Sequence, residues 1–127
     1  MSAKEKTILI VDDELEVSEL FSEMLTLVGF QVRSSHHYQH AIESINTSPP
    51  DGIVLDVMMP ETSGLEVLNF VRKHPIYRDI PVVIVSSKGF PVDIDNGVKA
   101  GANIYLTKPV SFPDLTRAVQ NALQASR

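Results

Sequence analysis

Short apolar runs alternate along the chain with longer segments in which apolar and polar residues are mixed. Four of the runs are almost entirely apolar and β-branched, without polar alternation: residues 7–11, 52–55, 81–85 and 104–106. Runs of this kind are typical of strands that are buried on both faces of a parallel sheet. A fifth run, residues 31–34, alternates polar and apolar side chains and predicts an edge strand.

The first mixed segment has the spacing of a helix. Its apolar residues follow the i, i+3, i+4, i+7 pattern of one helix face, at Val17, Leu20, Phe21, Met24, Leu25 and Val28. Gly29 follows where a C-terminal cap is expected. Similar but shorter patterns predict a second helix that ends before Pro49 and Pro50, and a third that ends near His74 and Pro75.

Two further helices are predicted after the run at residues 81–85. The last one begins near Ser111 and Asp114, which resemble a capping box. Its inner face is expected to comprise Leu115, Val119, Ala122 and Leu123. The other is a weaker helix former, because Gly89, Pro91 and Gly97 fall close together and an interior glycine alone costs about 1 kcal/mol relative to alanine. We expect this helix to be short or frayed.

The order of the elements is therefore a strand and a helix repeated five times. Because crossovers between parallel strands are right-handed, this order predicts an α/β fold, a doubly wound (βα)5 sandwich with helices on both faces of a five-stranded parallel sheet. A chain of 127 residues fits a single domain of this kind, residues 1–127, with its core over about residues 7–123.

Composition and charge narrow the class of protein. Hydrophobic residues make up 43% of the chain and charged residues 21%, which is enough to bury a core. The formal net charge of -5 would repel a phosphate backbone, so direct nucleic-acid binding is not expected. The absence of cysteine excludes disulfides and thiolate metal sites. No segment approaches the roughly 20 apolar residues of a membrane span, and we expect a soluble, cytoplasmic protein without membrane association.

Polar residues follow the predicted strands at the end where ligands bind in such a sheet. Asp12 and Asp13 follow the first run, Asp56 follows the run at 52–55, and Ser86 and Lys108 follow the last two runs. Carboxylates that converge in this way either raise a pKa or bind a cation. Since the candidate ligands are all oxygen atoms, the expected metal is Mg²⁺, with Mn²⁺ as an alternative.

The same residues predict a chemistry. A carboxylate beside Mg²⁺ and an ammonium group can attack phosphorus, because the positive charges neutralise the oxygens of the group that is transferred. We therefore interpret the cluster as a site for phosphoryl transfer to Asp56, assisted by Lys108.

Taken in order, these motifs resemble a response-regulator receiver domain of two-component signalling, in the CheY-like superfamily, over about residues 7–123. The resemblance rests on Asp12-Asp13, Asp56 with Met58-Met59-Pro60 and Gly64, Ser86, Ala100-Gly101-Ala102, Tyr105, and Lys108-Pro109. It implies a flavodoxin-like three-layer fold whose strands have the order 2-1-3-4-5.

The resemblance also implies a ligand set. Asp56 would be the phosphoacceptor in a Mg²⁺-dependent reaction. Asp13 and Asp56 would bind Mg²⁺ through their side chains, Asp12 largely through water, and the carbonyl group of Met58 would be a further ligand.

Roles in signalling follow from the same resemblance. Ser86 would hydrogen-bond the phosphoryl group, Lys108 would form an ion pair with it, and Tyr105 would be a rotameric switch that alters the surface of the fourth helix, fifth strand and last helix. The Lys108-Pro109 bond is often cis in this family. The expected partners are a sensor histidine kinase or histidine phosphotransfer protein as donor, and a downstream protein or effector domain, with a phosphorylation-linked homodimer as one outcome. The domain would catalyse only its own phosphorylation and dephosphorylation.

Several of these residues also have a purely structural interpretation. Asp13 can cap the first helix, with Glu16 completing a capping box. Asp56 can form a turn ahead of Pro60, and Ser86 can satisfy the backbone at the end of its strand.

Lys108 can equally be a solvated surface residue, and Tyr105 can be half-buried packing on an edge strand. His36 and His40, four residues apart, invite a metal interpretation, which we disfavour because no carboxylate supports the pair nearby in the sequence. The methionines at 58–59 are expected to fill the core beneath their loop.

Three other functions compete with a phosphorylation switch. The first is an interaction module that keeps the fold but acts without phosphorylation. The second is a phosphatase with an aspartyl nucleophile, which usually has a second Asp two residues later, where this chain has Met58. The third is a flavin or dinucleotide carrier, which would need a Gly-rich loop where Asp12-Asp13 stands. The resemblance further implies that Met58 and Lys88 influence the approach of the hydrolytic water. Because Met58 cannot hydrogen-bond water, we predict slow autodephosphorylation.

Overall fold

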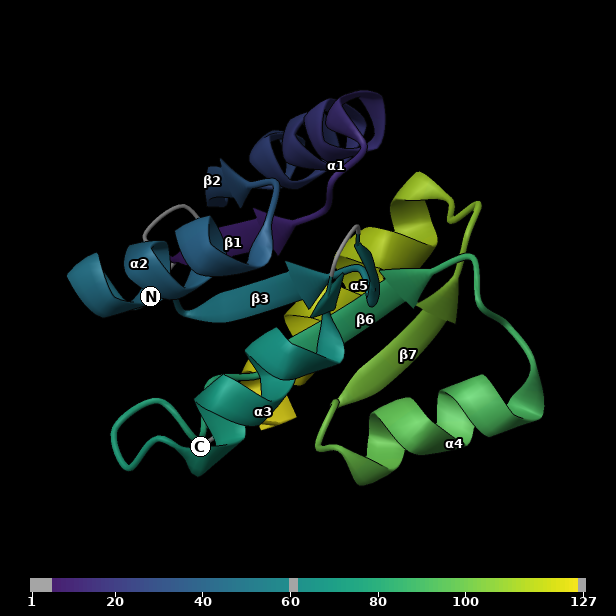
Figure 1. Cartoon of the computed structure of the whole chain (residues 1–127). Helices are drawn as coiled ribbons and strands as arrows, with labels where there is room; N and C mark the ends of the chain where they lie inside the picture. Colours follow the sequence, from purple (N-terminus) through teal and green to yellow (C-terminus); the bar gives the residue numbers. More distant parts are fainter. Residues whose placement is uncertain (1–5, 60–61, 126–127) are drawn as a thin grey trace.

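The computed structural model describes residues 6–59 and 62–125, and its main feature is a parallel sheet of five strands (Figure 1). From one edge to the other the strands are β2 (Gln31–Ser35), β1 (Thr7–Val11), β3 (Gly52–Leu55), β6 (Val82–Ser86) and β7 (Ile104–Thr107). Since β6 and β7 are the fourth and fifth strands of this sheet in chain order, the predicted 2-1-3-4-5 order is confirmed.

Two further strands were not expected from the apolar runs. β4 (Met58–Met59) and β5 (Thr62–Ser63) pair antiparallel and form a small separate ribbon. Strands of two residues are too short to show the period that identifies a strand in a sequence.

The strands of the sheet interior are buried on both faces, as their sequences predict. In β1, Leu9 and Val11 belong to one hydrophobic cluster, whereas Ile8 and Ile10 belong to another on the opposite face. The run at β7 departs from this expectation, because its residues are half-buried or exposed. β7 is an edge strand, with a neighbouring strand on one side alone.

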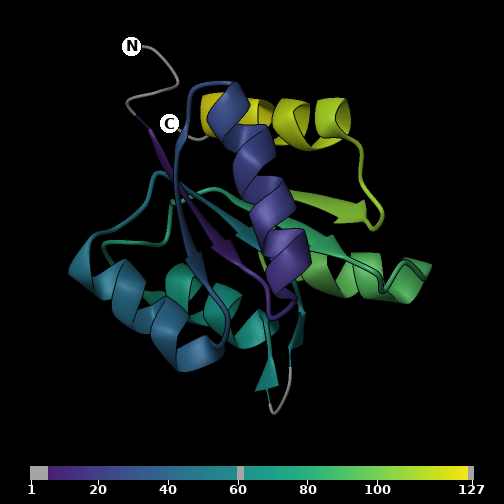
Figure 2. The same ribbon diagram turned by 90° about the horizontal axis from the view of Figure 1, so that it is seen from above.

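Helices cover both faces and complete the three layers (Figure 2). One face is covered by α1 (Leu15–Leu27) and α5 (Phe112–Ala125). The other is covered by α2 (Tyr38–Thr47), α3 (Leu65–Lys73) and α4 (Pro91–Lys99). None of the described helices has the length and apolar character needed to cross a membrane.

The predicted cap at the end of α1 is confirmed. Gly29 has φ 103°, its N–H donates to Thr26 O at 3.0 Å, and the N–H of Phe30 donates to Leu25 O at 3.1 Å. These two bonds define a Schellman motif, which needs a left-handed residue that glycine supplies without strain.

The inner face of α1 is narrower than predicted. Leu20 is 49% exposed, so its assignment to the buried face is wrong. Ser18 is buried instead, and its hydroxyl donates to the hydroxyl of Ser34 on β2 at 3.2 Å. The apolar pattern alone does not identify a small polar residue that finds a hydrogen bond inside.

The starts of α4 and α5 follow the local sequence. α4 has nine residues and begins with Pro91, whose fixed φ and missing N–H suit the first turn of a helix, so the prediction of a short helix is confirmed. At the start of α5, the backbone N–H of Asp114 donates to the hydroxyl of Ser111 at 3.2 Å, as expected for a helix cap.

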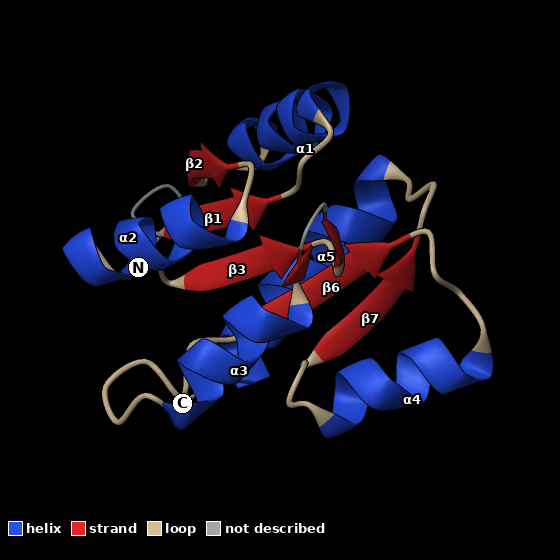
Figure 3. Ribbon diagram, viewed as in Figure 1, coloured by secondary structure: helices blue, strands red, loops and turns tan. Residues whose placement is uncertain are grey.

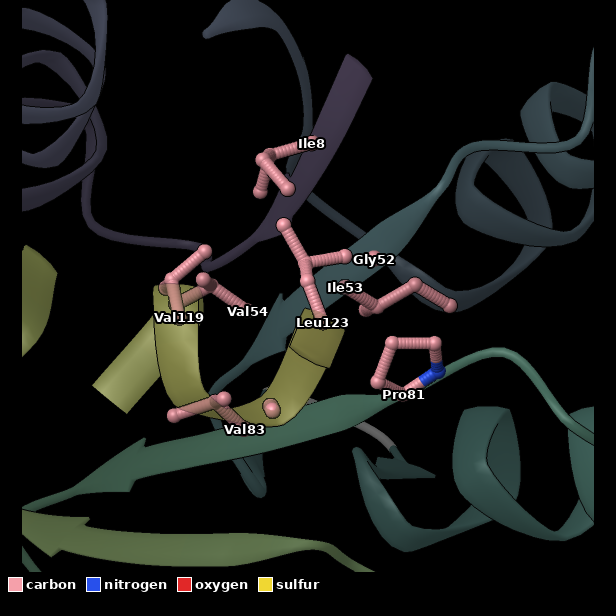
Figure 4. A pocket seen from close by; sticks show the side chains of 9 residues that line it. Ile8, Gly52, Ile53, Val54, Pro81, Val83, Val119 and Leu123 are labelled. Carbon is pink, nitrogen blue, oxygen red and sulfur yellow. The ribbon is translucent and has the colours of Figure 1, made fainter. Parts of the chain in front are cut away.

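The N-terminal ends of the strands pack against the C-terminal half of α5. The one hollow described there is about 10 Å³ and is lined by Ile8, Gly52, Ile53, Val54, Pro81, Val83, Val119, Ala122 and Leu123 (Figure 4). It is apolar and too small to hold a ligand. The polar residues singled out in the sequence lie at the opposite end of the sheet.

Candidate functional site

The carboxyl ends of all five parallel strands lie at one edge of the sheet, as the arrowheads in Figure 3 show. β1 is followed by Asp12 and Asp13, β3 by Asp56, and β7 by Lys108, while Ser86 is the last residue of β6. β1 and β3 are paired neighbours with Val11 opposite Leu55, so the acidic residues that follow them emerge side by side.

Three carboxylates meet at this edge. Asp12 and Asp56 are only 2% and 4% exposed, and Asp13 is half-buried. Each of the three offers one carboxylate oxygen that lies within 4.8 Å of the others, and no other group of three or more potential metal ligands is found in residues 6–59 and 62–125. The sequence therefore identified the acidic cluster correctly.

Lys108 lies within this cluster and not on the solvated surface. Its Nζ donates to Asp12 Oδ2 at 2.9 Å, to Asp56 Oδ2 at 3.0 Å and to Glu14 Oε1 at 2.9 Å, and its side chain is 12% exposed. The Lys108-Pro109 peptide bond is cis, as the resemblance implied. Burial by itself lowers the pKa of Lys108, but the hydrogen bonds with the three carboxylates outweigh burial and raise that pKa above its ordinary value.

Glu14 was missed by the sequence analysis. Its side chain is exposed, yet it supplies the third carboxylate around the ammonium of Lys108. The available signal was its position directly after Asp12-Asp13 on the same loop.

Asp12 is held by its backbone as well as its side chain. Its N–H donates to Ser35 O at 3.1 Å, its carbonyl accepts from His36 Nδ1 at 2.9 Å, and its Oδ1 accepts from the N–H of Glu14 at 2.9 Å. Burial raises the pKa of Asp12, against the lowering effect of Glu14 N–H and Lys108.

The histidines after β2 have structural partners in this arrangement. His36 binds the carbonyl of Asp12, and Nδ1 of His40 lies 2.9 Å from the hydroxyl of Ser35. His37 accepts a hydrogen bond from the N–H of His40 at the start of α2. These contacts account for the cluster without a metal ion.

The interpretation of Asp13 as a helix cap is wrong. α1 begins one residue later than that interpretation requires, with Glu14 at the N-cap position and no side-chain hydrogen bond to cap it. Asp13 is thus left half-buried beside the other two carboxylates, where its oxygen can serve as a ligand.

Asp56 has one hydrogen-bond donor on each carboxylate oxygen. The N–H of Met58 donates to Oδ1 at 2.9 Å, and Nζ of Lys108 donates to Oδ2 at 3.0 Å. The first bond is the local contact of a turn-forming aspartate, as the structural interpretation of Asp56 expects. Pro60, with which that turn was associated, lies outside the described residues.

Gly64, part of the recognised motif, lies against the backbone of Asp56. A Cβ atom on Gly64 would collide with the carbonyl oxygen of Asp56 and with the Cα of Val57. The glycine is therefore required by a close approach of α3 to the loop that carries Asp56.

The methionine pair divides between core and surface. Met59 is buried, but Met58 is 47% exposed, so the prediction that both fill the core is wrong for Met58. Because β4 is a strand, successive side chains point to opposite sides.

Ser86 and Tyr105 are joined through the backbone of one residue. The buried hydroxyl of Ser86 accepts from the N–H of Lys88 at 3.2 Å, and the hydroxyl of Tyr105 donates to the carbonyl of Lys88 at 2.6 Å. Burial of the phenol raises the pKa of Tyr105. The ring lies against Gly97 of α4. This link was not predicted, because Lys88 makes both contacts through its backbone and not through its side chain.

The donor set fits a hard divalent cation. All three candidate side-chain ligands are carboxylates, and with Glu14 they outnumber the single ammonium of Lys108. Oxygen ligands of this charge suit Mg²⁺, which usually takes one or two carboxylates and keeps several waters.

Comparisons with known proteins identify the family of this chain. A family model described as "Response regulator receiver domain" matches residues 8–120. The phosphate regulon transcriptional regulatory protein PhoB of Klebsiella pneumoniae is 34% identical over 119 residues, which are 94% of this chain and 52% of that protein. The chain thus spans about half the length of this curated relative.

Solved structures are similar over nearly the whole chain. The receiver domain of the Francisella response regulator 1452 superposes with a TM-score of 0.87 at 28% identity, covering 96% of this chain and 99% of that one. The chemotaxis protein CheY4 of Vibrio cholerae superposes with a TM-score of 0.86 at 26% identity, covering 92% and 98%.

Proposed function

The chain belongs to the response regulator receiver family of two-component systems, and on that premise we propose that Asp56 accepts a phosphoryl group from a phosphohistidine. The donor would be a sensor histidine kinase or a histidine phosphotransfer protein. The observation that carries the proposal is the carboxylate of Asp56, which is buried at a strand end, oriented by the N–H of Met58 and paired with Lys108.

In this reaction the phosphoryl group moves from a histidine of the donor protein to Asp56 of this chain. An oxygen of the Asp56 carboxylate attacks phosphorus, the P–N bond of the phosphohistidine breaks, and the imidazole leaves with the bonding electrons and takes up a proton. The carboxylate needs little reorientation, since hydrogen bonds already fix it. Lys108 then exchanges its contact with Asp56 Oδ2 for a phosphoryl oxygen, while Asp12 and Glu14 keep its ammonium in place.

Asp12, Asp13 and Asp56 are the residues that would hold Mg²⁺, with Mn²⁺ as an alternative and the carbonyl of Met58 as a further ligand by family resemblance. When bound, the ion supplies positive charge that offsets the charge of the phosphoryl oxygens. The excess of carboxylates over ammonium groups is the reason that the cation should bind before the phosphoryl group arrives.

The contacts of Lys88 supply a route from the phosphoryl group to Tyr105. When the hydroxyl of Ser86 turns to hydrogen-bond the phosphoryl group, it leaves the N–H of Lys88. The backbone of Lys88 is then free to shift, and its carbonyl releases the hydroxyl of Tyr105. The ring can turn inward, which is a two-state change of the kind that switches use.

The surface that changes consists of α4, β7 and α5. Val92 and Val98 of α4 are more than half exposed there, so a partner can read the position of the helix through apolar contacts. The partner would be a downstream protein or an effector domain, and a phosphorylation-linked homodimer would use the same surface.

Labelling by a small phosphodonor tests the proposal. Acetyl phosphate with Mg²⁺ should label the wild-type chain to about one phosphoryl group per molecule and should not label Asp56→Asn. Asp51→Asn is the matched control, because Asp51 is an exposed aspartate next to the other end of β3. The proposal fails if Asp56→Asn takes label like the wild type, or if a folded wild-type chain takes none with Mg²⁺ present. The second result would favour the phosphorylation-independent interaction module.

A further inference from the structure

Methionine is the only sulfur-containing residue in this chain, which has no cysteine. Of the methionines within residues 6–59 and 62–125, Met58 is 47% exposed, whereas Met59 is buried and Met24 is half-buried. Since thioether oxidation follows exposure, a soluble oxidant reaches Met58 before the other two.

Met58 also lies beside the acidic cluster. Its N–H is bonded to Asp56 Oδ1, and its Sδ lies 3.2 Å from the hydroxyl of Ser87, which donates to it. Ser87 directly follows Ser86. The thioether therefore bridges the two strand ends that carry the phosphoacceptor and the serine of the switch.

We propose that Met58 is a reversible oxidation site, and that its oxidation shortens the lifetime of the phosphoryl group on Asp56. The second half rests on the proposed function. With hydrogen peroxide as the oxidant, an S–O bond forms on Sδ, the O–O bond breaks, sulfur loses two electrons, and the other peroxide oxygen leaves as water. Methionine sulfoxide reductases, one for each sulfoxide epimer, restore the thioether.

Hydrogen bonding explains why oxidation should act on the phosphoryl group. A thioether is a weak acceptor, so Met58 cannot hold a water molecule firmly next to Asp56. A sulfoxide is polar, and its oxygen is a better acceptor for the hydroxyl of Ser87 and for water. Because the N–H of Met58 bonds to Asp56 Oδ1, water on the sulfoxide would lie next to the aspartyl phosphate, where it can attack phosphorus and raise the rate of hydrolysis.

Peptide mapping tests the first half without any need for phosphorylation. The folded chain is treated with hydrogen peroxide, digested, and analysed by mass spectrometry for the gain of one oxygen at each methionine. We expect Met58 to oxidise at least about tenfold faster than Met59, and the reductases to reverse the change. Equal rates at the two residues, or faster oxidation of Met59, would overturn the proposal.

Phosphoryl lifetime tests the second half. Wild type, Met58→Leu and Met59→Leu are each labelled with acetyl phosphate before and after peroxide, and loss of label is followed with time. Oxidation should speed the loss about fivefold, the equivalent of one ordinary hydrogen bond, in wild type and Met59→Leu. Met58→Leu should show the same rate with and without peroxide. An unchanged lifetime in oxidised wild type, or an equal response in Met58→Leu, would refute this half. A chain that takes no label would overturn the proposed function and this half together, while the peptide map would still decide whether Met58 is the reactive thioether.

Discussion

Replacing Gly97 by alanine measures how closely α4 packs against the ring of Tyr105. A Cβ at Gly97 would lie 2.7 Å from Cδ2 and 2.9 Å from Cε2 of Tyr105, and 3.0 Å from Cδ1 of Ile84. Carbon atoms in contact are normally about 3.5–4.0 Å apart. The ring or the helix must therefore move to accept the new methyl group.

Two opposing effects set the magnitude. Alanine is favoured over glycine inside a helix by about 1 kcal/mol. Overpacking a well-filled site costs about 1–3 kcal/mol. In the wild-type chain Gly97→Ala should thus lower the free energy of unfolding by about 0–2 kcal/mol. In a Tyr105→Ala background the ring is gone and the end methyl of Ile84 can shift, so the same substitution should raise it by about 0.5–1 kcal/mol.

Urea unfolding of the four proteins completes this double-mutant cycle, with an expected coupling of about 0.5–3 kcal/mol between residues 97 and 105. Val98→Ala is the control, because Val98 is an exposed residue of α4 and reports helix propensity alone. If Gly97→Ala stabilises the chain equally in both backgrounds, the ring of Tyr105 does not need a residue without Cβ at position 97, and the packing argument is refuted.

Three further predictions concern charged side chains. Arg72 donates hydrogen bonds to the carbonyls of Gly101, Arg78 and Ile80 and to the side chain of Asn103. Arg72→Met should therefore lower the free energy of unfolding by about 2–4 kcal/mol, and Arg72→Lys should lower it by less. A loss below about 0.5 kcal/mol for Arg72→Met in denaturant titrations would contradict this. Lys108→Met leaves the buried carboxylates of Asp12 and Asp56 without their ammonium group and should lower the free energy of unfolding in EDTA by about 3 kcal/mol. Saturating Mg²⁺ should then raise the melting temperature of this variant more than that of the wild type, and an equal rise in both proteins would be evidence against the charge argument. Because burial raises the pKa of Asp12, the folded chain retains a proton there at pH values where the unfolded chain has lost it. The contribution of Asp12 to stability therefore falls as the pH rises from the pKa of a free aspartate through the raised pKa of the folded chain. Asp12→Asn should therefore be more stable than wild type at pH 7 in EDTA, and this gain should vanish toward pH 3; a gain that is independent of pH would show that ionisation is not its cause.

Local sequence was sufficient for much of the fold. The runs at β1 and β3 were predicted to the residue, since an apolar β-branched segment bounded by polar residues has few alternatives. The end of α1 at Gly29 and the cap at Ser111 are likewise set by a few neighbouring residues. The acidic cluster was predictable because parallel strands bring their carboxyl ends to one edge.

The wrong or missed predictions share a cause, which is that local sequence does not show what packs around a residue. Leu20 continues the apolar pattern of α1 but faces solvent, since the width of the buried stripe depends on what packs against the helix. Asp13 is a residue type that often caps helices, but α1 begins two residues after it, so Glu14 takes the N-cap position. Glu14 was missed because it acts from an exposed position, and the role of Lys88 beside Tyr105 was missed because Lys88 acts through its backbone.

The sequence by itself determined the five strands and five helices of a doubly wound sheet and the set of carboxylates that gather at its edge, while the strand order was implied by the family resemblance. Periodicity and turn residues are local, and the crossover rule converts their order into a topology. The tertiary structure alone decided that Lys108 reaches Asp12, Glu14 and Asp56 together, and that Tyr105 bonds the backbone of Lys88, which also contacts Ser86. The contacts of Lys108 and Tyr105 join residues distant in the chain, and their distances are set by how the layers pack, which no local pattern contains.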